Sequence, residues 1–350
     1  MKPIEFKTTP QRILIIKPSA IGDVVHSLPI LNLIRKKWPE AHIAWVVTPA
    51  CAGLVERHPQ LDEIILFERR GGFRSFLKLG KVLKSKRFDL VIDLQGLARS
   101  GWMCWQTRAK FRVGFANARE LAWLAYSHRV PIETMEQHAI ERYLSIAERI
   151  GCPRGPVEFH FAVDDADRAR VRKLTGEAPY AVLMPGTNWA TKRWPASYFG
   201  EVAAPLREKY GLRAIVSGGK GDIELARAMS ESARAPLLDL CGQTNLRETV
   251  ALLERASLVI ANDSGPMHIA AALGRPLVTP YGPTNPVRTG PYGRMDSVVR
   301  LDIVCSPCYS RSCSHTSCMN WLKPELLMNE VGKWMSSMVT KSDHAGGPHS

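Results

Sequence analysis

The chain reads Leu258-Val-Ile-Ala-Asn-Asp-Ser-Gly-Pro-Met-His268 where its sequence is most informative. The first four residues are apolar, as in a buried strand, and the small apolar residues after His268 favour a helix. A strand that ends in Asp263-Ser264-Gly265 and passes at once into a helix leaves backbone N–H groups free at the helix N-terminus, where anions bind. The stretch therefore predicts a phosphate site, although an ordinary helix cap gives the same pattern.

Strand and helix patterns alternate along the rest of the chain. The predicted strands are residues 12–17, 42–47, 63–67 and 88–93 in the first half, and 180–184, 214–217, 237–240, 258–261 and 277–281 in the second. Such alternation is typical of parallel sheets covered by helices. The chain breaks at Gly151-Cys-Pro-Arg-Gly-Pro156. We therefore expect an α/β protein with two doubly wound, Rossmann-like domains that face a central cleft.

A length of 350 residues also favours two domains, because it exceeds one ordinary core. We expect the first domain to span residues 1–155 and the second to span residues 175–322. A helix over residues 323–340 is expected to pack back on the first domain. Residues 341–350, rich in Ser, His and Gly, are expected to form a disordered tail.

The net charge of +14 is spread unevenly. Residues 1–160 hold 25 Lys or Arg and 15 Asp or Glu, and the stretch from Arg69 to Arg87 holds eight basic residues and no acid. An anionic partner follows from this excess. Nucleic acid, an acidic membrane and a phosphorylated substrate are all compatible with it, and a solvated helix face is the plainer alternative for the distal lysines.

The sequence also bears on where the protein acts. No run of about 18 apolar residues is present, and Met1 to Pro10 lacks the apolar core of a signal peptide. We therefore expect a cytosolic protein.

The first half carries one candidate catalytic motif, Lys17-Pro-Ser-Ala-Ile-Gly-Asp23, between a strand and a helix. Asp23, beside the turn at Gly22, could accept a proton from an attacking hydroxyl. It could equally be the N-cap of the helix. Lys17 at the end of a buried strand needs an anionic partner.

The second half carries groups suited to a nucleotide. Thr187, Lys192 and a helix N-terminus within a few residues suit a diphosphate. Asp222, in a glycine-rich strand end, could bind ribose hydroxyls. The absence of G-x-G-x-x-G and of a P-loop argues against a dinucleotide dehydrogenase and a P-loop NTPase. Asp165-Ala-Asp167 spells a metal-binding D-x-D, but we interpret it as a solvated helix start.

The eight cysteines fall into two groups. Cys51, Cys104, Cys152 and Cys241 are scattered, as buried thiols are. A second group crowds into fourteen residues: Cys305, Cys308, Cys313 and Cys318. Structural zinc, free thiols and two disulfides are alternatives for it, and a cytosolic setting disfavours the disulfides. A catalytic metal is excluded there, since four cysteines would close the coordination sphere.

Together these motifs resemble glycosyltransferase family nine, the ADP-heptose:lipopolysaccharide heptosyltransferases with the GT-B fold. The resemblance covers about Arg12 to Val331. It rests on the motifs Arg12-Ile-Leu-Ile-Ile-Lys-Pro-Ser-Ala-Ile-Gly-Asp-Val-Val-His-Ser-Leu-Pro29, Asp93-Leu-Gln-Gly96, Pro185-Gly-Thr187 with Lys192-Arg-Trp-Pro195, and Asn262-Asp-Ser-Gly-Pro-Met-His268 with Tyr281-Gly-Pro-Thr284. Four motifs in this order are far more specific than any one of them.

The resemblance implies a role for each candidate residue. Asp23 matches the general base that deprotonates the acceptor hydroxyl. The implied donor-binding residues are Lys17, Gly22, Thr187, Lys192, Asp222, Thr244, Asp263, Ser264, Gly265 and His268, with Asp222 at the ribose and Thr244 near the adenine. The implied contacts to an anionic acceptor, Kdo-containing lipid A, are Arg69, Arg70, Arg74 and Arg119.

The resemblance further implies inverting transfer of a heptose from ADP-heptose, without a cofactor or catalytic metal. Within the family we expect the closest likeness to the enzymes that add the first heptose. The acceptor implies peripheral attachment to the cytoplasmic face of the inner membrane, and it explains the positive charge better than nucleic acid does. Two alternatives remain: a GT-B enzyme with another nucleotide sugar or acceptor, and a non-enzymatic protein that binds nucleotides or membranes.

Overall fold

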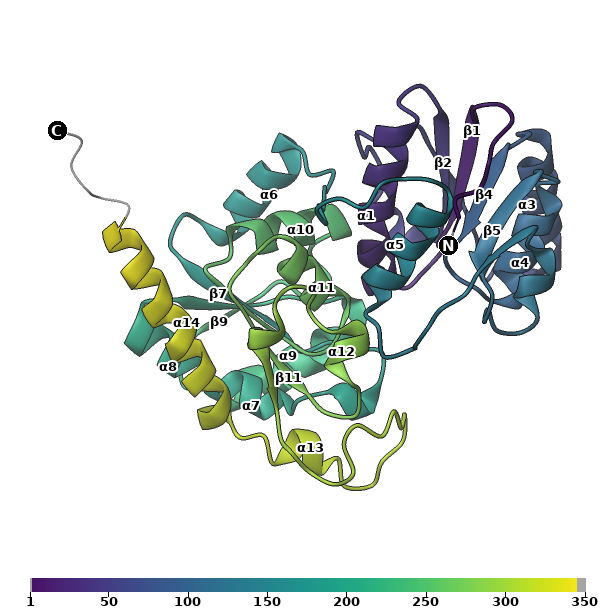
Figure 1. The fold of residues 1–350 in the computed structure, drawn as a ribbon. Coiled ribbons are helices and arrows are strands. Elements are labelled where there is room, and N and C mark those ends of the chain that lie inside the picture. Colours follow the sequence, from purple (N-terminus) through teal and green to yellow (C-terminus); the bar gives the residue numbers. More distant parts are fainter. Residues whose placement is uncertain (1, 345–350) are drawn as a thin grey trace. The chain divides into compact units, whose positions relative to one another are not determined.

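The structure is a computed structural model that describes residues 2–344. The chain divides into two compact units, and the boundary lies between Ala162 and Val163 (Figure 1). Each unit is built on one six-stranded parallel sheet, which confirms the prediction of two doubly wound α/β units.

The first unit has the strand order β3-β2-β1-β4-β5-β6. Its strands are β1 (Arg12–Ile16), β2 (His42–Val47), β3 (Glu63–Leu66), β4 (Leu90–Asp93), β5 (Phe111–Phe115) and β6 (His128–Val130). Its helices are α1 (Ile21–Lys37), α2 (Pro49–Ala52), α3 (Gly72–Ser85), α4 (Ala98–Gln106), the 3-10 turn η1 (Ala122–Ala125) and α5 (Ala139–Arg149). Strand β1 lies between β2 and β4, and its residues 13–16 are fully buried because helices cover both faces.

The second unit has the strand order β12-β11-β10-β7-β8-β9. Its strands are β7 (Tyr180–Met184), β8 (Arg213–Val216), β9 (Leu237–Asp239), β10 (Leu258–Ala261), β11 (Leu277–Tyr281) and β12 (Val298–Arg300). Its helices are α6 (Asp165–Thr175), η2 (Ala190–Lys192), α7 (Ala196–Glu201), α8 (Ala203–Tyr210), η3 (Lys220–Asp222), α9 (Ile223–Ser232), α10 (Leu246–Arg255), α11 (Gly265–Ala272), α12 (Pro286–Thr289), η4 (Met295–Ser297), α13 (Ser317–Asn320) and α14 (Pro324–His344).

Helix α14 belongs to the second unit. Its buried residues Leu327 and Val331 join the core that surrounds Trp194 and Phe199, whose rings meet edge to face at 4.9 Å. The sequence analysis expected this helix to pack back on the first domain, whereas Leu327 and Val331 contact the core of the second unit. The helix also continues to His344, so residues 341–344 of the expected disordered tail are helical, and residues 345–350 lie outside the described residues.

The stretch between the predicted domains is divided between the two units. Asn32 Nδ2 donates to the Glu158 carbonyl at 2.7 Å, which holds residues before Ala162 on the first unit. Helix α6 instead packs on α10, where Arg168 pairs with Glu254 at 2.8 Å. Helix α6 begins at Asp165, and this residue is exposed as expected for a solvated helix start. Asp167, in the same first turn, is instead buried and paired with Arg247 at 3.1 Å.

Of the helices described, none combines the length and apolar character that crossing a membrane requires.

Candidate functional site

Most of the predicted donor-binding residues lie in loops that follow four neighbouring strands of the second sheet. These strands are β10, β7, β8 and β9, in that spatial order. Ligands of doubly wound sheets bind beyond the carboxyl ends of the strands. The strand order therefore lays the predicted residues out as a row along one edge of the sheet.

Asp263, directly after β10, is the centre of a buried polar cluster. Its Oδ2 lies 2.6 Å from Lys192 Nζ and accepts a hydrogen bond of 2.6 Å from Thr284 Oγ1. Thr187 Oγ1 donates to the Asp263 carbonyl at 3.0 Å. The Asp263 side chain is only 5% exposed and that of Lys192 is 15% exposed. The carboxylate is thus occupied in holding Lys192 and Thr284, and the lysine is the group that can reach a ligand.

Asn262, which the sequence analysis did not single out, joins the loops after β7 and β10. Its Nδ2 donates to the Pro185 carbonyl at 2.8 Å, and its Oδ1 accepts from the Trp194 N–H at 3.0 Å. It is fully buried. A polar residue at the end of an apolar strand, just before the Asp263 turn, was a signal that could have identified it.

The N-terminus of α11 offers an anion site beside this cluster. Ser264 is the N-cap residue, and its Oγ is buried with no hydrogen-bond partner among the described residues. Gly265 begins the helix, and His268 lies buried in its first turn. An unpaired buried hydroxyl and the N–H groups of a helix end both favour a bound anion.

Asp222 bridges the loops after β7 and β8. Its Oδ2 accepts from the Gly219 N–H at 2.8 Å. A Cβ atom on Gly186 would come within 2.5 Å of the Asp222 carboxylate, and one on Gly218 within 2.6 Å. Both glycines are therefore required for this close approach, which brings Asp222 next to the loop that carries Thr187.

Thr244 lies in the loop after β9. Its Oγ1 is 3.2 Å from Thr249 Oγ1, and the nearby Gly242 N–H donates to the Gly218 carbonyl at 2.9 Å. The loops after β8 and β9 are thus joined, and Thr244 comes after Asp222 along the same edge.

In the first unit, Lys17 and Asp23 form a pair after β1. Lys17 Nζ lies 3.8 Å from Asp23 Oδ1, and Asp23 Oδ2 accepts from the Ala20 N–H at 3.1 Å. The Asp23 side chain is 41% exposed, whereas Lys17 is buried. Asp23 lies in the first turn of α1, with Gly22 buried beside it, and still presents a carboxylate to solvent. The alternative that Asp23 is the N-cap residue is wrong, because α1 begins at Ile21 and its N-cap is Ala20.

Lys17 is held by several groups. Its Nζ donates to the Leu94 carbonyl at 3.1 Å and lies 5.2 Å from the centre of the Tyr143 ring. Burial disfavours the charged ammonium, but Asp23 and Tyr143 outweigh it, so the pKa of Lys17 is raised above its usual value. Lys17 thus remains a cation beside Asp23 at neutral pH.

Asp93, from the second motif of the first half, is a structural carboxylate. It is fully buried and accepts hydrogen bonds from the Tyr126 hydroxyl at 2.7 Å and from the N–H groups of Gln95 at 2.9 Å and Gly96 at 3.1 Å. Burial raises its pKa despite these donors. It holds the turn after β4 in place.

The predicted acceptor-binding arginines lie near the ends of two strands. Arg69 and Arg70 are exposed in the β3–α3 loop, Arg74 is exposed in the first turn of α3, and Arg119 is exposed in the loop after β5. In the sheet order, β3 and β5 lie on opposite sides of β1, which leads to Asp23. The arginines therefore occur on both sides of the Asp23 loop.

The clustered cysteines surround a small pocket. All eight cysteines are free thiols in the part of the chain that the structure describes, and the four scattered ones are buried as predicted. A pocket of about 190 Å³ is lined by the four clustered cysteines, together with Thr191 and His315. Burial raises the pKa of Cys318, and the neighbouring thiols raise it further by a smaller amount. No group of three or more His, Cys, Asp or Glu within residues 2–344 is arranged to hold a metal ion.

The cysteine segment also brings an unpredicted cation toward Lys192. The Arg311 guanidinium lies 4.6 Å from the centre of the Trp189 ring, and Lys192 Nζ lies 4.7 Å from the same ring centre. Thr191 Oγ1 donates to the Ser310 carbonyl at 2.8 Å, which fixes this segment beside η2. The contact joins residues about 120 positions apart, and no local sequence pattern indicates it.

Comparisons with known proteins agree with this geometry. Residues 76–319 match the family described as glycosyltransferase family 9 (heptosyltransferase). The chain is 32% identical to lipopolysaccharide heptosyltransferase 1 of Pseudomonas aeruginosa, over 87% of this chain and 88% of that one. It is 29% identical to the lipopolysaccharide core heptosyltransferase OpsX of Haemophilus influenzae, over 85% of this chain and 86% of the other.

Among solved structures, the chain resembles E. coli heptosyltransferase WaaC with ADP. The TM-score is 0.76 and the identity 27%, over 92% of this chain and 99% of that one. The likeness extends over both units and confirms the predicted GT-B class.

Proposed function

The chain belongs to glycosyltransferase family 9, and from this premise we propose that it transfers a heptose from ADP-heptose to the inner core of lipopolysaccharide. The family makes it a glycosyltransferase. The donor is proposed because similar solved structures carry ADP and ADP-2-deoxy-2-fluoro heptose. The acceptor is proposed because the named relatives act on lipopolysaccharide.

The anion site at the start of α11 carries this proposal. Lys192 is held by Asp263 at 2.6 Å, and the unpaired Oγ of Ser264 lies at the helix end. We assign the donor diphosphate to Lys192, Thr187, Ser264 and Gly265, with His268 behind the turn. Asp263 positions Lys192 rather than binding the donor itself, because an open carboxylate would repel phosphate.

The nucleoside follows along the same edge of the sheet. Asp222, next to Gly186, is suited to accept hydrogen bonds from the ribose hydroxyls. Thr244 comes after it and is proposed to line the adenine pocket. The order of strands β10, β7, β8 and β9 thus matches the order of diphosphate, ribose and base.

Asp23 is proposed as the general base. A half-exposed carboxylate at the carboxyl end of a strand can accept the proton of an acceptor hydroxyl as that hydroxyl attacks the anomeric carbon. The bond to the ADP oxygen then breaks, and the configuration at the sugar inverts. Lys17 stabilises the charged carboxylate, and the buried Gly22 leaves room beside it.

The departing ADP needs positive charge, which Lys192 and the α11 N-terminus supply. We therefore propose that no divalent cation takes part. On the acceptor side, Arg69, Arg70, Arg74 and Arg119 are proposed to bind the carboxylates and phosphates of Kdo-bearing lipid A. The acceptor implies peripheral attachment at the cytoplasmic face of the inner membrane.

The deciding experiment measures ADP release from ADP-heptose with Kdo2-lipid A, in EDTA, for the wild type and Asp23→Ala. We expect wild-type turnover that is indifferent to EDTA and a loss of about 10²- to 10⁴-fold in kcat for Asp23→Ala. ADP binding, measured by calorimetry, should be unchanged in the variant. Intact ADP binding without wild-type turnover would discard the substrates and keep the nucleotide site.

The position of the added heptose is a finer proposal. We propose the first heptose, because the 32% identical relative is named heptosyltransferase 1. An assay with equal amounts of Kdo2-lipid A, or of the same acceptor already bearing one heptose, distinguishes addition of the first heptose from addition of the second. Turnover of the second acceptor alone would assign the later step, and turnover only with another nucleotide sugar would favour a different GT-B transferase.

A further inference from the structure

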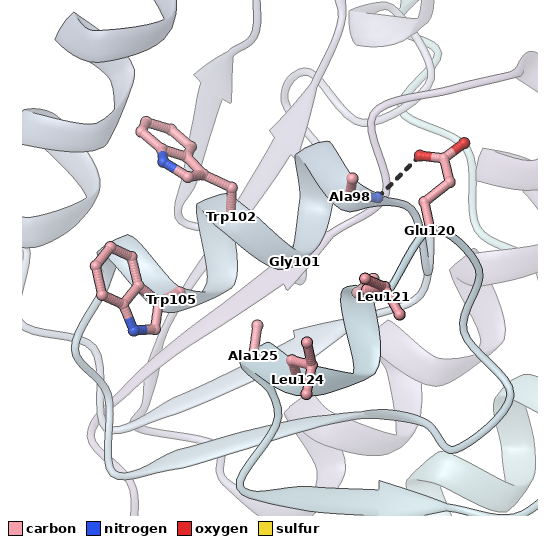
Figure 2. Close-up of a pocket in the computed structure, with 9 residues that line it drawn as sticks. Ala98, Gly101, Trp102, Trp105, Glu120, Leu121, Leu124 and Ala125 are labelled. Atoms are coloured by element: carbon pink, nitrogen blue, oxygen red, sulfur yellow. Dashed lines mark hydrogen bonds between the residues drawn. The ribbon is translucent and has the colours of Figure 1, made fainter.

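An apolar groove opens on the first unit between α4 and η1, as Figure 2 shows. Its volume is about 300 Å³, and its walls are Trp102 and Trp105 from α4, Leu121 at the N-cap of η1, and Leu124 within η1. Trp105 is 60% exposed, Leu121 64% and Leu124 61%. Single exposed apolar residues are ordinary, but large ones that gather around one groove mark a binding surface.

The groove is a fixed part of the fold. A Cβ atom on Gly101 would come within 2.9 Å of Ala122 Cα, so glycine lets α4 and η1 meet at the floor of the groove. At one end, the Ala98 N–H donates to Glu120 Oε2 at 3.0 Å (Figure 2). The two elements are thus locked together, and their large side chains stand out on either side.

Helix α3 extends the exposed apolar surface. It packs on α4 through Phe76 and Trp102, whose stacked rings are 3.9 Å apart. Its own Phe73 is 74% exposed and Leu77 is 43% exposed. Two neighbouring helices and η1 therefore all present large apolar side chains to solvent.

The elements that carry these apolar residues are also rich in exposed cations. Residues 66–129 hold 14 Lys or Arg and only four Asp or Glu, a net charge of +10 within a total of +14. One of the four acids, Asp93, is buried, and Glu120 is engaged at the start of α4. Exposed cations lie on α3 and at both ends of α4: Arg74, Lys78, Lys81, Lys84, Arg99 and Arg108.

We propose that the surface formed by Phe73, Leu77, Trp105, Leu121 and Leu124 docks on a lipid bilayer that carries anionic headgroups. Aromatic and aliphatic side chains enter the boundary between headgroups and acyl chains, while the lysines and arginines around them bind the headgroups. A second copy of the chain fits the surface poorly, because it would set one positive field against another. The inference rests on the proposed function in one respect, which is that a glycolipid acceptor requires the enzyme at a membrane.

The test measures sedimentation of the full chain with vesicles. One set is pure phosphatidylcholine, and the other contains equal parts of phosphatidylcholine and phosphatidylglycerol. The variant is the double substitution Trp105→Ser with Leu124→Ser. Its control is Trp321→Ser, which removes a tryptophan that is equally exposed, at 60%, in the second unit. Circular dichroism and thermal unfolding check that both units of each protein are folded.

We expect the wild type and Trp321→Ser to bind the anionic vesicles, less tightly at high salt, and to bind the neutral vesicles weakly. The double variant should lose at least about tenfold in affinity for the anionic vesicles. Equal binding by the double variant and the wild type overturns the proposal, and so does a wild type that binds neither vesicle. A wild-type dimer that the double substitution separates would assign the surface to self-association instead.

Vesicle binding needs no donor and no acceptor, so its outcome is separate from that of the transferase assay. Vesicle binding that depends on Trp105 and Leu124, in a protein without heptosyl transfer, would keep the docking surface and remove the proposed function. Transfer that is unaffected by the double substitution on acceptor embedded in anionic vesicles would remove the docking surface alone.

Discussion

Lys192 and Asp263 show how a buried carboxylate can prepare a phosphate site. Asp263 keeps a lysine and a threonine in fixed positions before any ligand is present, with both contacts at 2.6 Å. A cation held in place loses less conformational freedom when phosphate arrives, so more of the interaction energy appears as affinity. The Ser264 hydroxyl has no hydrogen-bond partner among the described residues, so a hydrogen bond from it to the proposed phosphate would replace no internal one.

Substitution of Lys192 by Ala tests this preparation. We expect ADP affinity to fall by about ten- to a hundredfold, since a charge-assisted hydrogen bond contributes about 1.5–3 kcal/mol. AMP, which lacks the second phosphate, should lose less. Calorimetric titration of both nucleotides measures the difference. Lys333→Ala, which removes an exposed lysine of α14, is the matched control and should change neither affinity. Equal losses for ADP and AMP would argue against a diphosphate at Lys192.

Lys17 makes a prediction about pH. Its pKa is raised above the usual value of 10.5, so folding favours its charged form. The stability that comes from this shift is fully present below about pH 10.5 and is lost as the pH rises through the folded pKa. The difference in free energy of unfolding between the wild type and Lys17→Met should therefore stay constant from pH 6 to 9 and fall at higher pH. Denaturant titrations across this range measure it, and a difference that changes between pH 6 and 9 would contradict the assignment.

The candidate residues that sequence patterns identified are those in the turns after strands, where local chemistry is visible. Asp23, Asp222 and Asp263 each lie two to seven residues beyond the end of an apolar strand. Arg311 and Asn262 act through contacts with distant segments, which no window of sequence contains. Lys192 was found from its place before a helix, but its pairing with Asp263 was not, since that contact joins loops 71 positions apart.

At the scale of elements, strands formed by an uninterrupted apolar run were predictable, and several elements without such a run were not. Strands β5 and β6 and helix α4 were absent from the sequence prediction. The β5 run Phe-Arg-Val-Gly-Phe contains an arginine and a glycine, and glycine weakens the strand pattern. Gly114 is nonetheless required there, because a Cβ atom on it would come within 2.3 Å of the Tyr126 ring. Tertiary packing, rather than local propensity, selects these elements.

The close approach of the loops after β7 and β8 requires glycine at position 186, where Asp222 lies against the backbone. This contact can be tested by substitution. In Gly186→Ala the new methyl group would meet the Asp222 carboxylate at 2.5 Å and displace it. We expect affinity for ADP to fall by about tenfold, while affinity for inorganic pyrophosphate stays unchanged, because only the ribose contact is lost.

Gly221→Ala is the control for Gly186→Ala. No described atom lies within 4 Å of a Cβ built on Gly221, and it sits in the same glycine-rich segment as Asp222. Its ADP affinity should match the wild type. Competitive titrations with ADP, adenosine and pyrophosphate measure each part of the site. A Gly186→Ala protein that loses pyrophosphate and adenosine equally would show that the whole loop, and not Asp222, has moved.

At the scale of the molecule, each unit has its own sheet and its own core, and the proposed roles divide between them. The nucleotide residues lie beyond residue 162, whereas the proposed base, the arginines and the docking surface lie before it. The sequence indicated this division through its charge, which is concentrated in the first half. It could not indicate that α14 packs on the second unit, since an amphipathic helix fits either core.

This division predicts which part of the molecule ADP stabilises. A ligand that binds only the folded second unit raises the stability of that unit, by about 2.7 kcal/mol at a hundred times its dissociation constant. Scanning calorimetry with and without ADP should therefore move one unfolding transition and leave the other in place. Lys192→Ala should reduce the movement, and Asp23→Ala should leave it as in the wild type, because of these two residues only Lys192 is proposed to contact the nucleotide. If ADP moved both transitions equally, or if Asp23→Ala abolished the movement, the nucleotide would depend on the first unit as well. The assignment of donor binding to the loops after β7, β8, β9 and β10 would then be incomplete.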